Sequence, residues 1–226
     1  MGFLRLIGVV MLKDLRAELR TKEAVNASLS FALVVLVLFS FAFDPDEETT
    51  RAISGGLLWI VFAFAGTLLL NRSFARELPN DCLDALISAP IPGSALLLGK
   101  ALANFLLVLA VEFIALPLFG IFYNVHWTAQ WPQLLLVILL ATWGMTITGT
   151  IFSALTVNIR LREVMLPILN FPILIPALLG AMQLTSALVA GQPITEANSS
   201  WLKMLIGFDI MYTAVSVFLV ETVLVG

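Results

Sequence analysis

The chain has 226 residues, of which 60% are hydrophobic and 12% are charged, and its formal net charge is −3. An average soluble domain is about 45–50% apolar and about 25% charged, so this composition predicts an integral membrane protein rather than a soluble domain. The small net charge and the scattered cations argue against a nucleic-acid partner.

Cysteine and histidine each occur once in the sequence, as Cys82 and His126. A single cysteine excludes an intrachain disulfide, a CxxC redox pair and a multi-cysteine metal site. One histidine cannot build a metal site alone. We therefore expect no metal site in this chain, and we interpret Cys82 as an inert small side chain.

The N-terminal segment, residues 1–24, carries two separate stripes at 100° per residue. The apolar stripe consists of Phe3, Ile7, Met11 and Leu15, and the basic stripe consists of Lys13, Arg16 and Arg20. This pattern predicts an amphipathic helix lying in the interface of the membrane. Two roles for it stay open, an anchor to anionic lipid and a docking surface for a partner protein.

Beyond this segment, the sequence predicts a single all-α transmembrane domain with no soluble domain of useful size. A span needs about 20 mainly apolar residues. Windows of that kind predict six transmembrane helices, at about 25–43, 53–71, 95–122, 133–157, 164–190 and 203–225. The first apolar run is longer than the core of a signal peptide and lacks a convincing cleavage site, so we expect it to be retained.

Lysine and arginine are divided unequally between the two sides of this predicted topology. One side carries Arg5, Lys13, Arg16, Arg20, Lys22, Arg72, Arg76, Lys100, Arg160 and Arg162, and the other carries only Arg51 and Lys203. Short loops rich in these residues stay cytoplasmic. We therefore expect both termini in the cytoplasm.

No catalytic set is evident within the predicted spans. The stretch GSALLLGKA at 93–101 has five residues between its glycines and Ala101 after its lysine, so it lacks the GxxxxGK[ST] spacing that cradles phosphates. The chain is therefore not expected to bind ATP or to be an enzyme. Glu112 is the deepest charge, and it either lines a substrate path or bonds to a neighbouring helix as a protonated group.

Prolines and small residues distinguish the fifth and fourth spans. Pro167, Pro172 and Pro176 favour kinks in the fifth span, so Glu112, Pro167, Asn170 and Pro172 are candidate residues of an intramembrane path. In the fourth span the pairs Gly144 with Thr148 and Gly149 with Ser153 favour close helix packing over ligand binding.

The loop before the third span, RELPNDCLDALISAPIPG at 76–93, predicts a short helix. Asn80 suits its N-cap, Asp81 and Asp84 suit its first turn, and Pro90 and Pro92 end it. Its apolar face consists of Leu83, Leu86 and Ile87. A two-turn helix is not stable alone, so this face must dock on the membrane surface or on a cytoplasmic protein.

This loop resembles the cytoplasmic loop of ABC-2-type permeases in its polar run, its LDALISAP stretch at 83–90 and its following glycine-lysine pair. It departs from the usual Gly-Thr at Asp81-Cys82. Over essentially the whole chain, the sequence resembles the haem exporter protein B family. The segments that carry this wider resemblance are NASLSFALVVLVLFSFAF at 26–43, GLLWIVFAFAGTLLLNRSFARE at 56–77 and LPILNFPILIPALLGA at 166–181.

The resemblance implies a permease subunit of the cytochrome c maturation ABC complex in the bacterial inner membrane. Its implied partners are two copies of an ATPase subunit that binds the ATP, a second permease copy, a haem-handling membrane subunit, a small single-span subunit, a periplasmic haem chaperone and membrane lipids. The loop would act as a coupling helix that contacts the ATPase. The residues expected in this contact are Arg76, Glu77, Asp81, Leu83, Asp84, Leu86 and Ile87.

Haem is handled by such a complex, but the family leaves open whether it passes through this subunit. His126 lies in a short loop among aromatic residues typical of a membrane interface, so a haem contact there is the less favoured reading. Two other functions stay open. One is an ABC-2-type exporter of a lipid or another small molecule, and the other is an assembly scaffold that transports nothing.

Overall fold

The computed structural model describes residues 2–42, 48–79, 82, 86, 88–124, 130–196 and 198–225. All regular elements in these ranges are helices, and the predicted all-α membrane fold is confirmed. The elements are α1 (Phe3–Thr21), α2 (Glu23–Ala42), α3 (Glu48–Leu70), the short 3-10 helix η1 (Ala75–Glu77), α5 (Gly93–Phe122), α6 (Trp131–Thr156), α7 (Arg162–Val189) and α8 (Ser199–Val225).

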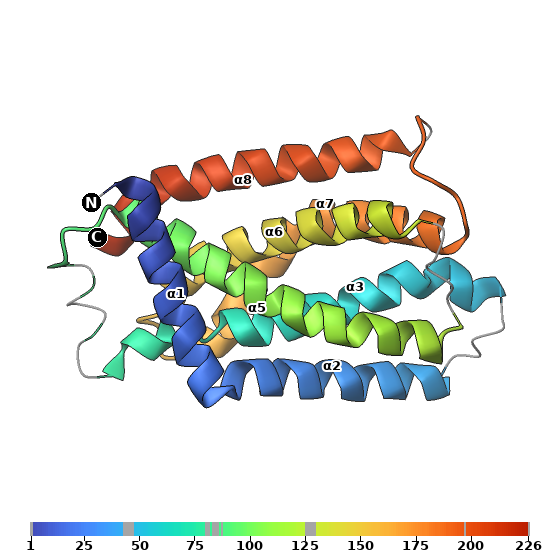
Figure 1. Cartoon of the computed structure of the whole chain (residues 1–226), viewed down its shortest axis with the longest axis horizontal. Helices are drawn as coiled ribbons and strands as arrows, with labels where there is room; N and C mark the ends of the chain where they lie inside the picture. Colours follow the sequence, from blue (N-terminus) through green and yellow to red (C-terminus); the bar gives the residue numbers. More distant parts are fainter. Residues whose placement is uncertain are drawn as a thin grey trace.

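The six helices α2, α3, α5, α6, α7 and α8 are long and apolar enough to cross a membrane, as the sequence predicted. They lie along one another in a bundle, and α1 lies across the end of the bundle where both termini are found (Figure 1). Lys22 separates α1 from α2 with a left-handed conformation, φ 55°. This single residue turns the chain sharply from the crosswise helix into the first span.

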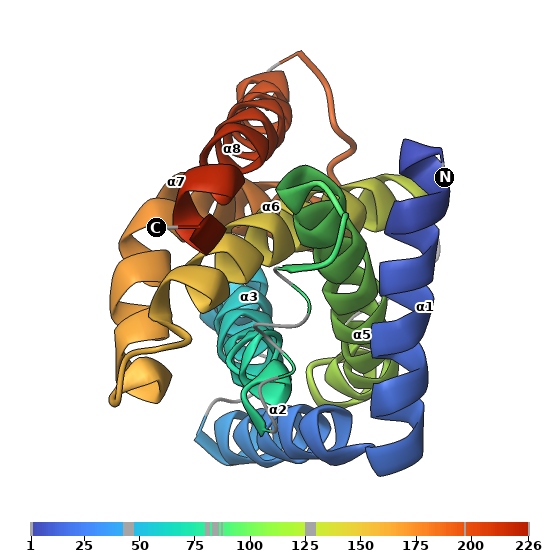
Figure 2. The same ribbon diagram turned by 90° about the vertical axis from the view of Figure 1, so that its left-hand side faces the viewer.

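The centre of the bundle is formed by α3 and α6, which the other spans surround (Figure 2). In each of these two helices 72% of the most apolar window is buried within the chain, compared with 22% in α2. The peripheral helices therefore expose apolar faces to the hydrocarbon or to other subunits. Trp59 of α3 is fully buried and donates its indole N–H to Thr185 Oγ1 of α7 at 2.9 Å, which fixes these two helices to each other.

Small residues of α6 lie at helix contacts, as the sequence predicted. A Cβ added at Gly144 would come within 2.6 Å of Asp209 Oδ1 of α8, and one added at Gly149 would come within 2.5 Å of Leu70 Cδ1 of α3. Thr148 Oγ1 donates back to the Gly144 carbonyl at 2.8 Å, which satisfies its hydroxyl inside its own helix. The small residues of α6 therefore serve packing within one subunit.

Two adjacent glycines of α3 are expected to respond oppositely to the same substitution. A Cβ at Gly55 would lie 2.6 Å from the Met182 carbonyl oxygen and 2.8 Å from the Ser186 backbone nitrogen, and neither backbone atom can move away alone. At Gly56 nothing lies within 4 Å of an added Cβ. Gly55→Ala should lower the free energy of unfolding by about 1–3 kcal/mol.

Gly56→Ala should leave this free energy within about 1 kcal/mol of the parent value, because only helix propensity changes. Unfolding in mixed micelles, followed by circular dichroism, measures both variants. Equal stability of the two variants would show that α3 and α7 do not meet at Gly55.

Candidate functional site

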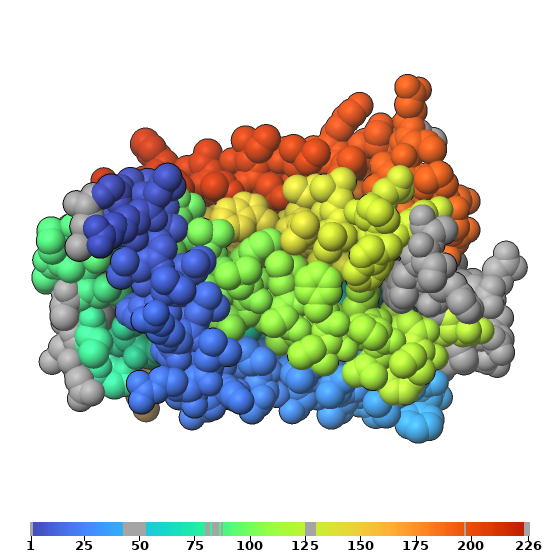
Figure 3. Space-filling model, viewed as in Figure 1, coloured from blue at the N-terminus to red at the C-terminus, as the bar shows by residue number. Residues whose placement is uncertain are grey.

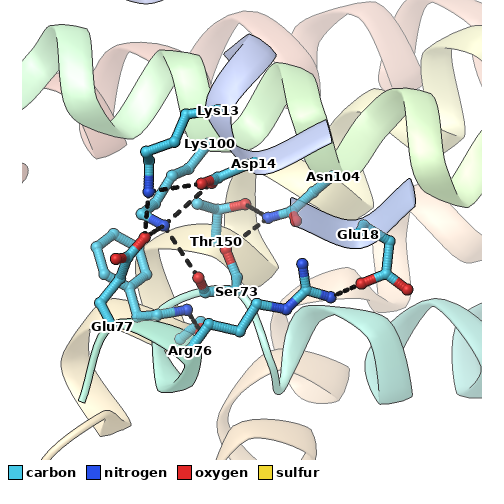
Figure 4. A network of polar contacts seen from close by, with 11 residues as sticks. Lys13, Asp14, Glu18, Ser73, Arg76, Glu77, Lys100, Asn104 and Thr150 are labelled. Atoms are coloured by element: carbon cyan, nitrogen blue, oxygen red, sulfur yellow. Dashed lines mark hydrogen bonds and ion pairs between the residues drawn. The ribbon is translucent and has the colours of Figure 1, made fainter. Parts of the chain in front are cut away.

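Lys100 of α5 is the centre of a buried polar network beneath α1 (Figure 4). Its side chain is 0% exposed, and its ammonium group donates to Asp14 Oδ2, Glu77 Oε1 and the Ser73 carbonyl oxygen, each at 3.0 Å. The nitrogen also lies 4.9 Å from the centre of the Phe74 ring. Three acceptors use all three N–H groups of an ammonium ion, so the buried charge is satisfied.

A glycine lets α1 approach α5 closely enough for these contacts. A Cβ added at Gly99 would lie 2.6 Å from Val10 Cβ and 2.9 Å from the Ile7 carbonyl oxygen. The space-filling view shows α1 lying directly on α5 (Figure 3). Asp14 and Glu18 follow Val10 at spacings of four residues, so both carboxylates lie on the face that α1 turns toward the bundle.

Further ion pairs join α1 to the segment after α3. Lys13 pairs with Glu77 and with Asp14, and Arg76 pairs with Glu18, which is 1% exposed. Burial disfavours the charge on Lys13, but the carboxylates of Asp14 and Glu77 outweigh this effect and raise the pKa of its ammonium group above the usual value. The pairs alternate positive and negative groups across the contact, and the paired charges neutralise one another.

Glu18 has a second role at the corner between α1 and α2. Its Oε1 accepts the backbone N–H of Val25 at 2.8 Å, and its Oε2 accepts the guanidinium of Arg76. The first turn of a helix leaves backbone N–H groups without intrahelical acceptors, and a carboxylate there satisfies one of them. The same side chain thus joins α1, α2 and η1.

Hydrogen bonds extend the network to α6. Asn104 donates through its side-chain amide to Ser73 Oγ at 2.8 Å and to Thr150 Oγ1 at 2.9 Å. Ser153 Oγ accepts the backbone N–H of Phe74 at 3.4 Å. The turn after α3 is therefore held by α1, α5 and α6 together, so a displacement of this turn has to displace or break contacts with all three helices.

The predicted coupling residues fall into two groups. Arg76 and Glu77 belong to the polar network, and Leu86 is half-buried against a small cluster of the chain's own core. That cluster consists of Val10, Phe74, Leu96, Ala154 and Val157. Cys82 and Ser88 are exposed. The remaining predicted residues, Asp81, Leu83, Asp84 and Ile87, lie outside the described residues, as do the expected cap Asn80 and the loop histidine His126.

The basic stripe predicted for the N-terminal helix is divided by the structure. Lys13 is drawn into the polar network, whereas Arg16 and Arg20 are exposed on the outer side of α1. The inner face of α1 is formed by Ile7, Val10 and Glu18. Helix α1 thus packs against its own chain, and Arg16 and Arg20 remain exposed to its surroundings.

The structure places the predicted path residues in different surroundings. Glu112 is buried, accepts a hydrogen bond of 2.6 Å from Thr142 Oγ1 of α6, and borders a crevice of α3 and α5 too narrow for water. Asn170 is fully buried, Pro167 is half-buried, and Pro172 is exposed on the opposite side of α7. The α-helix α7 continues from Arg162 to Val189 through all three of its prolines.

Sequence reasoning missed two carboxylates of the network and three of its neutral members. Asp14 and Glu18 were not singled out, and neither were Ser73, Asn104 and Thr150. One signal was available, because the four-residue spacing of Val10, Asp14 and Glu18 places two carboxylates beside an apolar position on one helix face. A lysine just inside the following span, Lys100, was the corresponding signal on the other partner.

Comparison with known proteins identifies the relatives of this chain. The CcmB protein family matches residues 5–225. Heme exporter protein B of Rhodobacter capsulatus is 33% identical over 173 residues, which cover 76% of this chain and 78% of that protein. Heme exporter protein B of Paracoccus denitrificans is 29% identical over 187 residues, covering 82% and 85%. The protein of the same name from Pseudomonas aeruginosa is 26% identical over 205 residues, covering 91% of each chain. Because the family match runs from Arg5 almost to the C-terminus, through α1 and all six spans, the chain belongs to the CcmB family.

Proposed function

We propose that this chain is the permease subunit of a haem-export complex that acts in cytochrome c maturation in the bacterial inner membrane. The observation that carries the proposal is the family match over residues 5–225. Relatives named heme exporter protein B support it, because their alignments with this chain cover 78% and 91% of their own length. Six candidate spans agree with a multi-pass membrane subunit.

The energy for this work comes from a separate ATPase subunit. GSALLLGKA at 93–101 has neither the glycine spacing nor the hydroxyl residue of a phosphate-binding loop. It also opens α5, where Lys100 is already occupied by Asp14, Glu77 and Ser73. The other partners are a second permease copy, a haem-handling membrane subunit, a small single-span subunit and a periplasmic haem chaperone.

Contact with the ATPase is made by the cytoplasmic segment 76–88. Arg76 and Glu77, at its start, are ion-paired to α1 and α5, so a push on the segment is transmitted to the crosswise helix and to the third span at once. Leu86 packs partly on the chain's own cluster, and the exposed Cys82 and Ser88 turn toward the surroundings. Both termini lie at this end of the bundle and are therefore cytoplasmic (Figure 1).

The function is tested by deleting the gene and restoring it on a plasmid. We expect deletion to stop cytochrome c maturation while haem-loaded chaperone accumulates, because the complex no longer releases it. Restoration with the intact chain should reverse both effects. Normal maturation in the deletion strain would contradict the proposal. Normal maturation with an intact permease but a hydrolysis-dead ATPase would instead identify the chain as a scaffold.

A further inference from the structure

Asp209 of α8 is a carboxyl group buried at the depth of the membrane interior. It follows Ser199, the first residue of α8, by ten positions, which is about 15 Å along a helix that rises about 1.5 Å per residue. A hydrocarbon core is about 30 Å thick, so Asp209 lies near its middle. The residue is 6% exposed, and neither carboxyl oxygen has a hydrogen-bond partner among the described residues. Ionisable groups at this depth are costly and mark candidate functional sites.

The carboxyl group of Asp209 lies against bare backbone of α6. A Cβ added at Gly144 would come within 2.6 Å of Asp209 Oδ1 and within 3.1 Å of the Phe208 ring. One turn further along α8, Thr213 Oγ1 accepts the indole N–H of Trp143 from α6 at 3.0 Å. Asp209 therefore lies in the contact between α6 and α8, where the missing side chain of Gly144 leaves room for it.

The side-chain donors of α6 around Gly144 are already used. Within four residues of this glycine, on either side, four side chains carry an N–H or O–H group, and each donates to another acceptor. The acceptors are Glu112 Oε2 for Thr142, Thr213 Oγ1 for Trp143, and carbonyl oxygens of α6 itself for Thr146 and Thr148. The contact between α6 and α8 thus places an acceptor beside donors that have other partners.

No cation pairs with Asp209 in the part of the chain that the structure describes. Helix α8 packs against α5, α6 and α7, and α6 contains no charged residue. The other titratable residues of these helices are Lys100 and Glu112 of α5, Arg162 and Glu163 of α7, and Lys203, Tyr212 and Glu221 of α8. Lys100 is held by Asp14 and Glu77, and Lys203 is exposed. The negative charge of an ionised Asp209 would therefore be uncompensated.

An ionised carboxylate that has neither a cation nor a donor is so costly in a protein interior that the group takes up a proton instead. We propose that Asp209 is a proton-binding site within the membrane. At neutral pH its carboxyl group carries a proton in the folded chain, and release of this proton to water weakens the contact between α6 and α8. Gly144 is the positioning residue, because it leaves the space that the carboxyl group fills. This inference does not depend on the proposed haem-export function.

Infrared spectroscopy of the purified chain in nanodiscs at neutral pH tests the bound proton directly. The spectrum of the parent minus that of Asp209→Asn should contain the carbonyl stretch of a protonated carboxyl group. The matched control Glu221→Gln changes an exposed carboxyl group of the same helix and should remove carboxylate bands only. Carboxylate bands alone in the Asp209→Asn difference would overturn the proposal, and so would a parent spectrum without any protonated carboxyl band. Loss of the band when the other subunits are present would assign the group to an ion pair with a partner and contradict the proposal.

The pH dependence of unfolding in mixed micelles tests the effect of the proton on the fold. An aspartate of the unfolded chain is ionised at neutral pH, so raising the pH favours unfolding as long as the folded chain keeps its proton. One such group raises the unfolding equilibrium constant about tenfold per pH unit. Asp209→Asn should remove this contribution, whereas Glu221→Gln should keep it. An equal pH dependence of the parent and Asp209→Asn would contradict the proposal.

Discussion

Replacement of Lys100 by methionine is expected to destabilise the chain by about 3–5 kcal/mol, because removing one partner of a buried ion pair leaves the other uncompensated. Lys100 is 0% exposed and its ammonium group contacts Asp14, Glu77 and the Ser73 carbonyl. Methionine preserves the length and apolar stem of the side chain, so lost packing contributes little. The free energy of unfolding in mixed micelles measures the effect.

The control for this substitution is Lys203→Met. Lys203 is exposed near the start of α8 and makes no ion pair among the described residues. Helix α8 begins at the end of the bundle opposite the two termini (Figure 1). Its replacement should change the stability by less than about 0.5 kcal/mol. If Lys100→Met changed the stability as little as this, the buried network would not hold α1 in place.

A double variant separates loss of the ion pair from simple loss of a side chain. Glu77 contacts both Lys100 and Lys13, so Glu77→Gln removes one of the two carboxylates that face Lys100. The pair Glu77→Gln/Lys100→Met should cost less than the sum of the single changes, by about 0.5–3 kcal/mol. Strict additivity would show that the two groups do not interact energetically.

The six spans could be predicted from the sequence because their length and apolar content alone decide them. The windows predicted at 53–71 and 95–122 correspond to α3 (Glu48–Leu70) and α5 (Gly93–Phe122). No knowledge of neighbouring helices is needed for such an element. The same holds for α1, whose 3.6-residue periodicity predicted a helix within residues 1–24.

The face that α1 turns inward could not be predicted in the same way. A stripe of Phe3, Ile7, Met11 and Leu15 was expected, but Phe3 is exposed and the buried Glu18 lies on the inner face. A local sequence pattern predicts that a carboxylate on a helix faces the solvent. Here Glu18 faces inward because its partner, Arg76, comes from a segment 58 positions later in the chain. Ion pairs between distant segments leave no local period in the sequence.

The prolines of α7 also show which features local sequence predicts and which depend on tertiary packing. The prolines of 164–190 favoured kinks and a path, but Asn170 and Pro172 lie on opposite sides of α7, since residues two apart on a helix differ by about 200°. Helical spacing alone predicts this separation. Which of the two sides faces the bundle depends on α3, α6 and α8, against which α7 packs.

The second large effect concerns the proposed contact between segment 76–88 and the ATPase. Cys82 is the only cysteine of the chain and is exposed, so it carries a thiol-specific cross-linker without further engineering. In membranes that contain both subunits, a short maleimide-to-amine linker on Cys82 should join the permease to the ATPase. Because the linker is short, it forms a product only if an amine of the ATPase lies close to Cys82.

Cys82→Ser should abolish the cross-linked product, and Cys82→Ser/Gln192→Cys provides a matched thiol at the opposite end. The connection between α7 and α8 lies at the end of the bundle away from both termini (Figure 1), and Gln192 of this connection is exposed. Cross-linking from these two positions tests the coupling of the ATPase to this chain most directly. A product with the ATPase from the parent chain, through Cys82, and none from the double variant is the expected result. A product from the double variant alone, through its thiol between α7 and α8, would contradict both the contact and the orientation of the chain in the membrane.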